Sequence, residues 1–228
     1  MASVISVRTF EALSVAMWLY GIIWVVCKRT PVRLGVYFGA STLMTFDWVF
    51  NSNWFFRVTY DPKFIALWQL AGVAQPLAIA CNYAFFFGMP VLLLVERRAW
   101  LDRRLGPSGY AAVFVLGVAL EPLADLPAVR LGLWTYYQAP EFMVCGVPWS
   151  IFWFSGLLTV TCYAAVRLAT RWAALELPDA PKEASRETFW RGFLLGAGAI
   201  WSAFYVCLNL QLFWYALARP WIPGPRPF

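Results

Sequence analysis

The sequence predicts an all-α fold, a polytopic integral membrane bundle of six transmembrane helices, with seven as the alternative. Of its 228 residues, 61% are hydrophobic and only 13% are charged, whereas soluble domains carry roughly 25% charged residues. Such a chain cannot give a soluble domain a polar surface. Its apolar segments approach the roughly 20 residues that a membrane-spanning helix needs. We therefore expect one multi-pass domain over residues 1–228, located in the cell membrane.

The expected spans are apolar runs bounded by charged residues, prolines or polar clusters. The third is unusually long, and a break at Gln75 and Pro76 gives the seven-span alternative. Gly146-Val147-Pro148 is expected to start the fifth, because proline is tolerated in a helix's first turn. Residues 171–188 form a polar loop, and the proline-rich tail 219–228 is expected to be irregular. The six spans are Ala12–Cys27, Val36–Phe56, Phe64–Val95, Tyr110–Leu126, Val144–Leu168 and Phe189–Leu217.

The basic residues predict how the bundle sits in the membrane. Lys28–Arg33, Arg97–Arg104 and Arg167–Arg191 hold 12 of the 18 basic residues. Six spans place these three stretches on one side, which the positive-inside rule makes cytoplasmic. A seven-span arrangement can be oriented to give the same ratio, so charge alone does not decide the number of spans. We favour six because both halves of a divided third span would be short.

Several classes of function are disfavoured by composition. The chain has no histidine, so haem, histidine-ligated zinc and di-iron sites are not expected. All three lysines lie outside the apolar segments, which leaves none to form a buried Schiff base. There is no Asp-rich metal–diphosphate motif, and we predict neither a metal nor another cofactor. The net charge of +6 suits membrane lipid head groups rather than nucleic acid. The expected partners are lipids and a lipophilic small-molecule substrate, and the oligomeric state is left open.

Three acidic residues within the expected spans are the candidate catalytic groups, because an acidic side chain in the bilayer is costly and by default functional. Asp47 and Glu121 each lie eleven residues into their spans, which is roughly 16 Å and close to mid-membrane. Asn51 and Asp125 follow them by four residues, on the same helical faces. If these faces meet, they form one buried polar cluster. Alternatively, Asp125 pairs with Arg130 at the interface.

Two uncompensated carboxyls at one depth cannot readily both ionise, so one is expected to remain a neutral carboxylic acid. In an apolar cavity such a group is a proton donor. Aromatic rings around it could stabilise a carbocation through their π faces. The candidate substrate-binding residues, most of them aromatic, are Trp48, Asn51, Tyr83, Trp134, Trp149 and Trp153.

The stretch from Glu121 to Gly156 carries a family resemblance. It contains Glu121, Pro122 and Ala124, then Gly132 and Trp134, then Gly146-Val147-Pro148-Trp149. This resembles the carotenoid-biosynthesis membrane family that includes the bisanhydrobacterioruberin-type carotenoid hydratases. Those proteins have an acidic-Pro-x-Ala element, Gly-x-Trp, and Gly-Val-Pro before an aromatic-rich helix. The family usually has Asp where Glu121 stands and Asn where Ile151 or Phe152 stands, and the match covers about a sixth of the chain.

The overall plan is also similar to small membrane terpene cyclases of fungal meroterpenoid and indole-diterpene pathways, which have a Trp-flanked acid in the second span. Asp47-Trp48 would occupy that position, with the usual order reversed. Both resemblances imply protonation of an alkene or epoxide, followed by capture of the cation by water or by an internal double bond. The sequence hypothesis is therefore an isoprenoid cyclase or hydratase. The alternatives are a proton-coupled transporter or channel that uses the same carboxyls, and a non-catalytic assembly subunit.

Overall fold

A computed structural model describes residues 2–28, 30–43, 58–70, 73–137, 143–176 and 186–218. Five helices in these ranges are long and apolar enough to cross a membrane, which supports the expected all-α membrane bundle. The second of them is continuous through a π-helical turn, η2 (Ala84–Gly88). Six spans are not confirmed. The five helices are α1 (Val4–Cys27), α4–η2–α5 (Leu77–Glu96), α7 (Ser108–Arg130), α8 (Trp149–Glu176) and α9 (Arg186–Ala218).

The expected second span is described only in its first part. Helix α2 (Pro31–Thr42) begins five residues earlier than expected, with Pro31 in its first turn, where the missing N–H costs no hydrogen bond. Three of the candidate site residues that follow, Asp47, Trp48 and Asn51, lie outside the described residues. Their predicted roles therefore stay predictions.

The expected third span is wrong in its first half. Strands β2 and β3 form an antiparallel hairpin there, and the helix begins at Leu77, directly after Pro76. The segment is thus neither one long helix nor two short ones. A short apolar run does not by itself distinguish a strand from a helix, and this explains the error. The strands are β1 (Val58–Tyr60), β2 (Ala66–Leu70), β3 (Val73–Pro76), β4 (Trp134–Tyr136), β5 (Met143–Val144) and β6 (Val147–Pro148).

The fifth span begins later than expected. Strands β5 and β6 form a second hairpin, whose turn residues Cys145 and Gly146 both have positive φ, at 52° and 86°. Two consecutive left-handed residues are typical of the tight turns that join antiparallel strands. Helix α8 therefore starts at Trp149, and Pro148 ends the hairpin instead of lying in the first helical turn.

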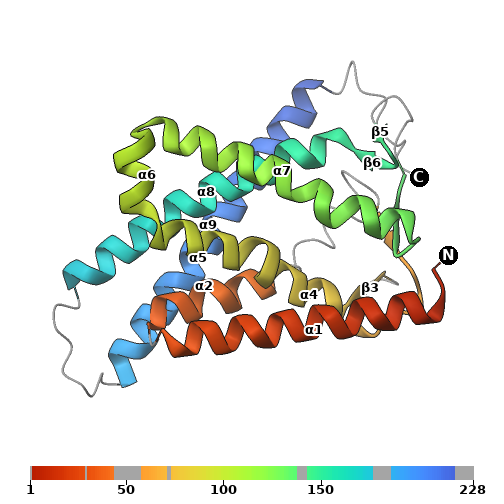
Figure 1. Cartoon of the computed structure of the whole chain (residues 1–228), viewed down its shortest axis with the longest axis horizontal. Coiled ribbons are helices and arrows are strands. Elements are labelled where there is room, and N and C mark those ends of the chain that lie inside the picture. Colours follow the sequence, from red (N-terminus) through yellow and green to blue (C-terminus); the bar gives the residue numbers. More distant parts are fainter. Residues whose placement is uncertain are drawn as a thin grey trace.

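Successive long elements run in opposite directions. Figure 1 shows α1, α4–α5 and α8 running one way along the molecule, and α2, α7 and α9 running the other way. Helices α2 and α9 approach closely through glycines. A Cβ added at Gly35 would lie 1.9 Å from the Phe193 carbonyl oxygen, and one at Gly196 would lie 2.0 Å from the Val32 carbonyl oxygen. Small residues of this kind permit close helix packing in membranes.

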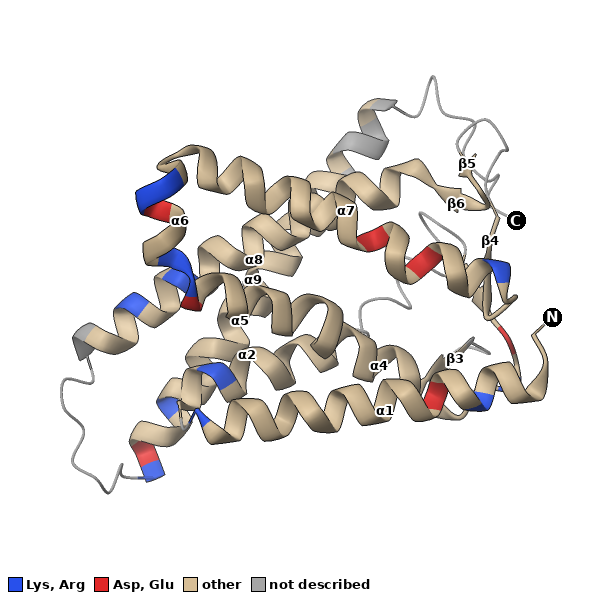
Figure 2. Cartoon of the chain, in the orientation of Figure 1, with Lys and Arg blue, Asp and Glu red and all other residues tan. Residues whose placement is uncertain are grey.

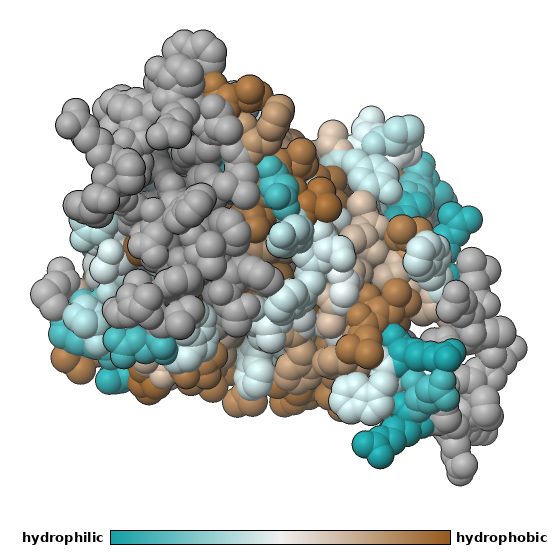
Figure 3. All heavy atoms as spheres, turned by 180° about the vertical axis from the view of Figure 1, so that it is seen from behind, coloured by the Kyte–Doolittle hydropathy of each residue, from teal (hydrophilic) through white to brown (hydrophobic). Residues whose placement is uncertain are grey.

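One end of the bundle, where α6 (Arg98–Leu105) lies, carries most of the described basic side chains (Figure 2). Glu96 forms an ion pair with Arg33 at 3.0 Å. Arg167 donates two hydrogen bonds to the Asp102 carboxylate, at 2.7 and 2.8 Å. On the face shown in Figure 3, hydrophobic side chains cover mainly the middle and hydrophilic ones gather toward the ends. The described basic residues of the three stretches therefore lie at one end, as expected, and we call it the basic end.

At the opposite end, β1 pairs with β4, and the carboxylate of Asp61 ties this end to the start of α1. The Asp61 carboxylate accepts hydrogen bonds from the backbone N–H groups of Ala2 at 2.9 Å and Lys63 at 3.0 Å. The Lys63 ammonium lies 3.5 Å from Asp61 Oδ2. Burial alone would raise the pKa of Asp61, but these hydrogen bonds and the Lys63 charge hold that pKa below its ordinary value. We call this end the strand end.

Candidate functional site

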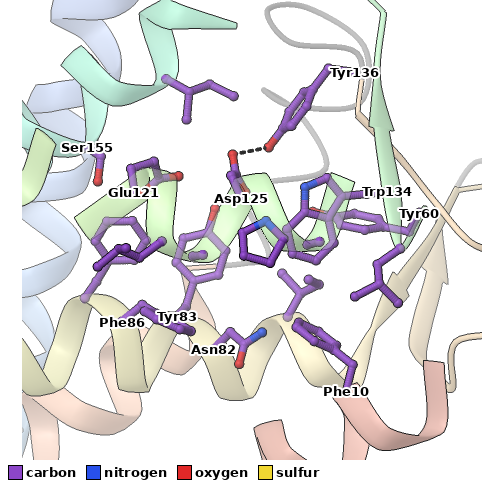
Figure 4. A pocket seen from close by; sticks show the side chains of 18 of the residues that line it. Phe10, Tyr60, Asn82, Tyr83, Phe86, Glu121, Asp125, Trp134, Tyr136 and Ser155 are labelled. Carbon is purple, nitrogen blue, oxygen red and sulfur yellow. Dashed lines mark hydrogen bonds between the residues drawn. The ribbon is translucent and has the colours of Figure 1, made fainter. Parts of the chain in front are cut away.

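A cavity of about 250 Å³ lies toward the strand end of the bundle. It is lined mainly by α4, η2, α7 and α8, and residues of strands β1 and β4 and one side chain of α1 complete the lining (Figure 4). Most of its lining is apolar and aromatic, and the polar groups are few. The lining includes Phe10, Tyr60, Asn82, Tyr83, Phe86, Phe87, Glu121, Asp125, Trp134, Tyr136, Phe154 and Ser155.

Two of the three predicted acids line this cavity. Glu121 and Asp125 are one turn apart on α7, and Asp125 is only 6% exposed. The hydroxyl of Tyr136 donates a hydrogen bond of 2.8 Å to Asp125 Oδ2. The spacing of four residues therefore places both carboxyls on the inner face of the helix, as predicted.

A glycine turn brings Trp134 and Tyr136 to the same cavity. Gly132 has a φ of 70°, and the N–H groups of Gly132 and Leu133 bond to the carbonyls of Val129 and Ala128. This pattern ends a helix and favours glycine at the left-handed position. The chain returns as β4, in which alternate residues share a face. Trp134 and Tyr136 face the cavity, and Thr135 between them is exposed.

The Tyr136 hydroxyl is a permanent hydrogen-bond donor. Burial, followed by the nearby Asp125, Tyr60 and Glu121, raises the pKa of Tyr136 well above its ordinary value. The phenol therefore stays protonated throughout the physiological range.

Trp134 is held in place by aromatic neighbours. It is 6% exposed and makes edge-to-face contacts with Phe10 and Tyr60, with ring centroids 5.7 and 6.1 Å apart. Its indole Nε1 has no hydrogen-bond partner in the part of the chain that the structure describes, and neither has Asn82 Oδ1. Trp134 lines the same cavity as Glu121, and its expected role in substrate binding stays a prediction.

Tyr83 also lies where a site residue was expected. It stacks on Phe87, with ring centroids 5.4 Å apart, and Figure 4 shows it extending from α4 toward α7. The cavity thus has aromatic rings on the side opposite the two carboxyls.

Two other predicted aromatic residues are not in this cavity. Trp149 and Trp153 lie on another face of α8 and line a separate apolar groove with Leu210 and Gln211. Trp153 is 61% exposed and packs edge-to-face on Phe114, with ring centroids 4.8 Å apart. Because a membrane helix is apolar on several faces, its sequence did not show which face turns inward. Other residues of α8 line the cavity, namely Ile151, Phe154, Ser155 and Leu158.

The predicted alternative partner of Asp125 is also wrong. Arg130 is exposed, and no ion pair between described residues joins it to Asp125. The hydrogen bond from Tyr136 was missed. It could have been found by extending the strand alternation two residues beyond Trp134.

Metal binding and similarity to known proteins add no further assignment. In the described ranges, no three Asp, Glu, Cys or His side chains are grouped so that they could hold a metal ion. Comparison with family models, with curated proteins and with solved structures gives no match. The function is therefore argued from the cavity itself.

Proposed function

We propose that this protein is an integral membrane enzyme that protonates an alkene or epoxide of a lipophilic isoprenoid, leading to cyclisation or hydration. The observation that carries the proposal is the pair of carboxyls on one face of α7 in an aromatic cavity, one of them bonded to a partly buried tyrosine. A preorganised acid in apolar surroundings is suited to proton transfer. Aromatic π faces suit the cation that follows.

The hydrogen bond from Tyr136 suggests how the two acids divide their roles. Tyr136 donates to Asp125, which favours the charged form of Asp125. Glu121, one turn away on the same helix, is the proposed proton donor. Asp125 is the proposed acceptor, oriented by Tyr136. Asp47 remains an additional candidate acid.

The proposed reaction uses both groups in sequence. The Glu121 proton adds to one alkene carbon, the π electrons form the new C–H bond, and the positive charge stays on the other carbon. With an epoxide, the proton goes to oxygen and a C–O bond breaks. The cation is captured by water or by an internal double bond. The proton then released passes to the carboxylates, which restores the starting charge.

The cavity volume bounds the part of the substrate that enters. An engineered cavity of about 150 Å³ holds benzene, so about 250 Å³ accommodates a group of roughly ten carbons. A longer isoprenoid would place only its reacting end here.

Conservative substitution of the acids tests the proposal. Membranes containing the wild type, Glu121→Gln or Asp125→Asn are incubated with C10–C40 polyprenyl alkenes and epoxides, and the extracted lipids are analysed by mass spectrometry. Positioned acid–base groups typically contribute about 10²–10⁴-fold, so each variant should lose at least about 100-fold in rate. Glu187→Gln, an exposed acid paired with Arg191, is the matched control and should retain full activity.

Asp47→Asn is measured beside them, because it tests the remaining predicted acid. Full activity in both Glu121→Gln and Asp125→Asn would refute the assignment. Proton flux into protein-containing vesicles, without any new lipid product, would instead favour the transporter alternative.

A further inference from the structure

The indole N–H of Trp134 is a buried donor at the cavity wall. Trp134 lines the cavity, is 6% exposed, and its Nε1 has no partner among the described residues. Buried polar groups in proteins are nearly always hydrogen-bonded, so such an exception needs an explanation. An indole N–H can only donate. Its missing partner is therefore an acceptor.

Aromatic contacts and a glycine turn hold Trp134 in place. Phe10 and Tyr60 contact the indole ring edge-to-face, and the Gly132 turn precedes its strand. Figure 4 shows the indole nitrogen on the side of the ring that faces Asp125 and the cavity. Because the nitrogen is buried, a ligand in the cavity would reach it only if the side-chain atoms that cover it moved.

We propose that the ligand of this cavity carries an acceptor oxygen on an otherwise apolar prenyl chain, and that Trp134 binds this oxygen. This inference rests on the proposed function and narrows its substrate class to prenyl alcohols, ethers, epoxides or ketones. A pure hydrocarbon would leave the N–H unpaired. Asn82 Oδ1, the second cavity-lining polar atom without a described partner, can only accept a hydrogen bond, so among these ligands only a prenyl alcohol would satisfy both atoms. Trp134 is thereby a substrate-positioning and specificity residue.

Binding, measured without turnover, tests the proposal. Purified protein in lipid nanodiscs is titrated with geraniol, geranyl methyl ether and the hydrocarbon myrcene, and each affinity is corrected for partition into empty nanodiscs. Both oxygenated probes offer an acceptor, and myrcene offers none. One net hydrogen bond should make each oxygenated probe bind roughly threefold to tenfold more tightly than myrcene.

Two substitutions isolate the N–H group. Trp134→Phe keeps an aromatic ring but removes the donor, and should bring the affinity ratio between oxygenated and hydrocarbon probes close to one. Trp172→Phe, at an exposed position of α8, is the matched control and should keep the wild-type ratio. The unfolding midpoint of each variant shows whether it remains folded.

The wild-type comparison alone can overturn the proposal. Equal affinity for myrcene and both oxygenated probes would mean that a bound water satisfies Trp134 and that the ligand needs no oxygen. A preference that survives in Trp134→Phe would assign the oxygen to another group. The readout is binding without turnover, so the absence of any lipid product would refute the catalytic proposal and leave this affinity ratio as a separate test.

Discussion

The hydrogen bond between Tyr136 and Asp125 gives the sharpest energetic prediction, because it joins a buried carboxyl to a partly buried phenol at the proposed reaction centre. Tyr136→Phe removes only the hydroxyl that donates to Asp125 at 2.8 Å. Hydrogen bonds to charged groups contribute about 1.5–3 kcal/mol, and those between neutral groups about 0.5–1.5 kcal/mol. If Asp125 is the carboxylate of the pair, we expect a coupling free energy in the upper range.

A double-mutant cycle measures that coupling. Tyr136→Phe, Asp125→Asn and the double variant are unfolded by increasing the mole fraction of sodium dodecyl sulfate in dodecyl maltoside micelles. The coupling free energy is the difference between the double variant's loss in free energy of unfolding and the sum of the losses in the two single variants. Tyr137→Phe is the matched control, because the neighbouring Tyr137 is 54% exposed. It should change stability by less than about 0.5 kcal/mol.

The pH dependence of the coupling follows from the direction of the Tyr136 shift. A pKa raised by folding contributes stability that is present below the ordinary tyrosine value and is lost as pH rises through the folded value. Because burial and nearby carboxyls raise the pKa of Tyr136 well above its ordinary value, the donor does not titrate between pH 5 and 9. A decrease in coupling at low pH would therefore report protonation of Asp125. A coupling below about 0.5 kcal/mol at every pH would refute the proposed carboxylate–phenol pair.

Three further predictions concern the scaffold. Gly35→Ala would place a methyl group 1.9 Å from the Phe193 carbonyl oxygen and should lower the free energy of unfolding by about 3 kcal/mol in the same assay. The control is Gly198→Ala, where an added methyl group would have nothing within 4 Å. It should leave the free energy of unfolding unchanged or raise it by up to about 1 kcal/mol. Folding lowers the pKa of Asp61, so the Asp61 carboxylate should stabilise the protein at pH values above the ordinary aspartate pKa, and this stabilisation should decrease as pH falls through the lower pKa of the folded state. Asp61→Asn should remove this pH dependence. An unchanged pH profile of stability would contradict the assignment. Cysteines introduced into Arg97–Arg104 should react with impermeant maleimide only from the cytoplasmic side; labelling from outside would invert the orientation.

The membrane class and the main elements of the site could be predicted from sequence. Long apolar runs locate most of the spanning helices, because only length and composition matter for crossing a bilayer. The i, i+4 spacing placed Glu121 and Asp125 together, because a helix fixes that geometry locally. Trp134 was singled out by the Gly132-x-Trp134 element of the family resemblance, and not by any geometric argument.

Other features depend on tertiary structure that the sequence pattern does not encode. The β2–β3 hairpin is apolar enough to look like part of a span, and pairing between its strands, rather than composition, defines it. Trp149 and Trp153 face away from the cavity because α8 is apolar on several sides, so hydrophobicity could not identify its inner face. Gln75 is fully buried with neither amide atom hydrogen-bonded to a described residue, and its sequence context gives no sign of this.

The proposed site is largely local in sequence, and this has a mechanistic consequence. Residues 121–136 supply both acids, the helix end, the Gly132 turn and the side chains of Trp134 and Tyr136. Pro122 and Pro127 lie within the same part of α7 and lack the N–H that would pair with the carbonyls of Val118 and Leu123. The backbone beside the acids therefore has fewer internal hydrogen bonds than an uninterrupted helix. Leu123 also lines the cavity, so this weakened part of the helix lies beside the proposed site.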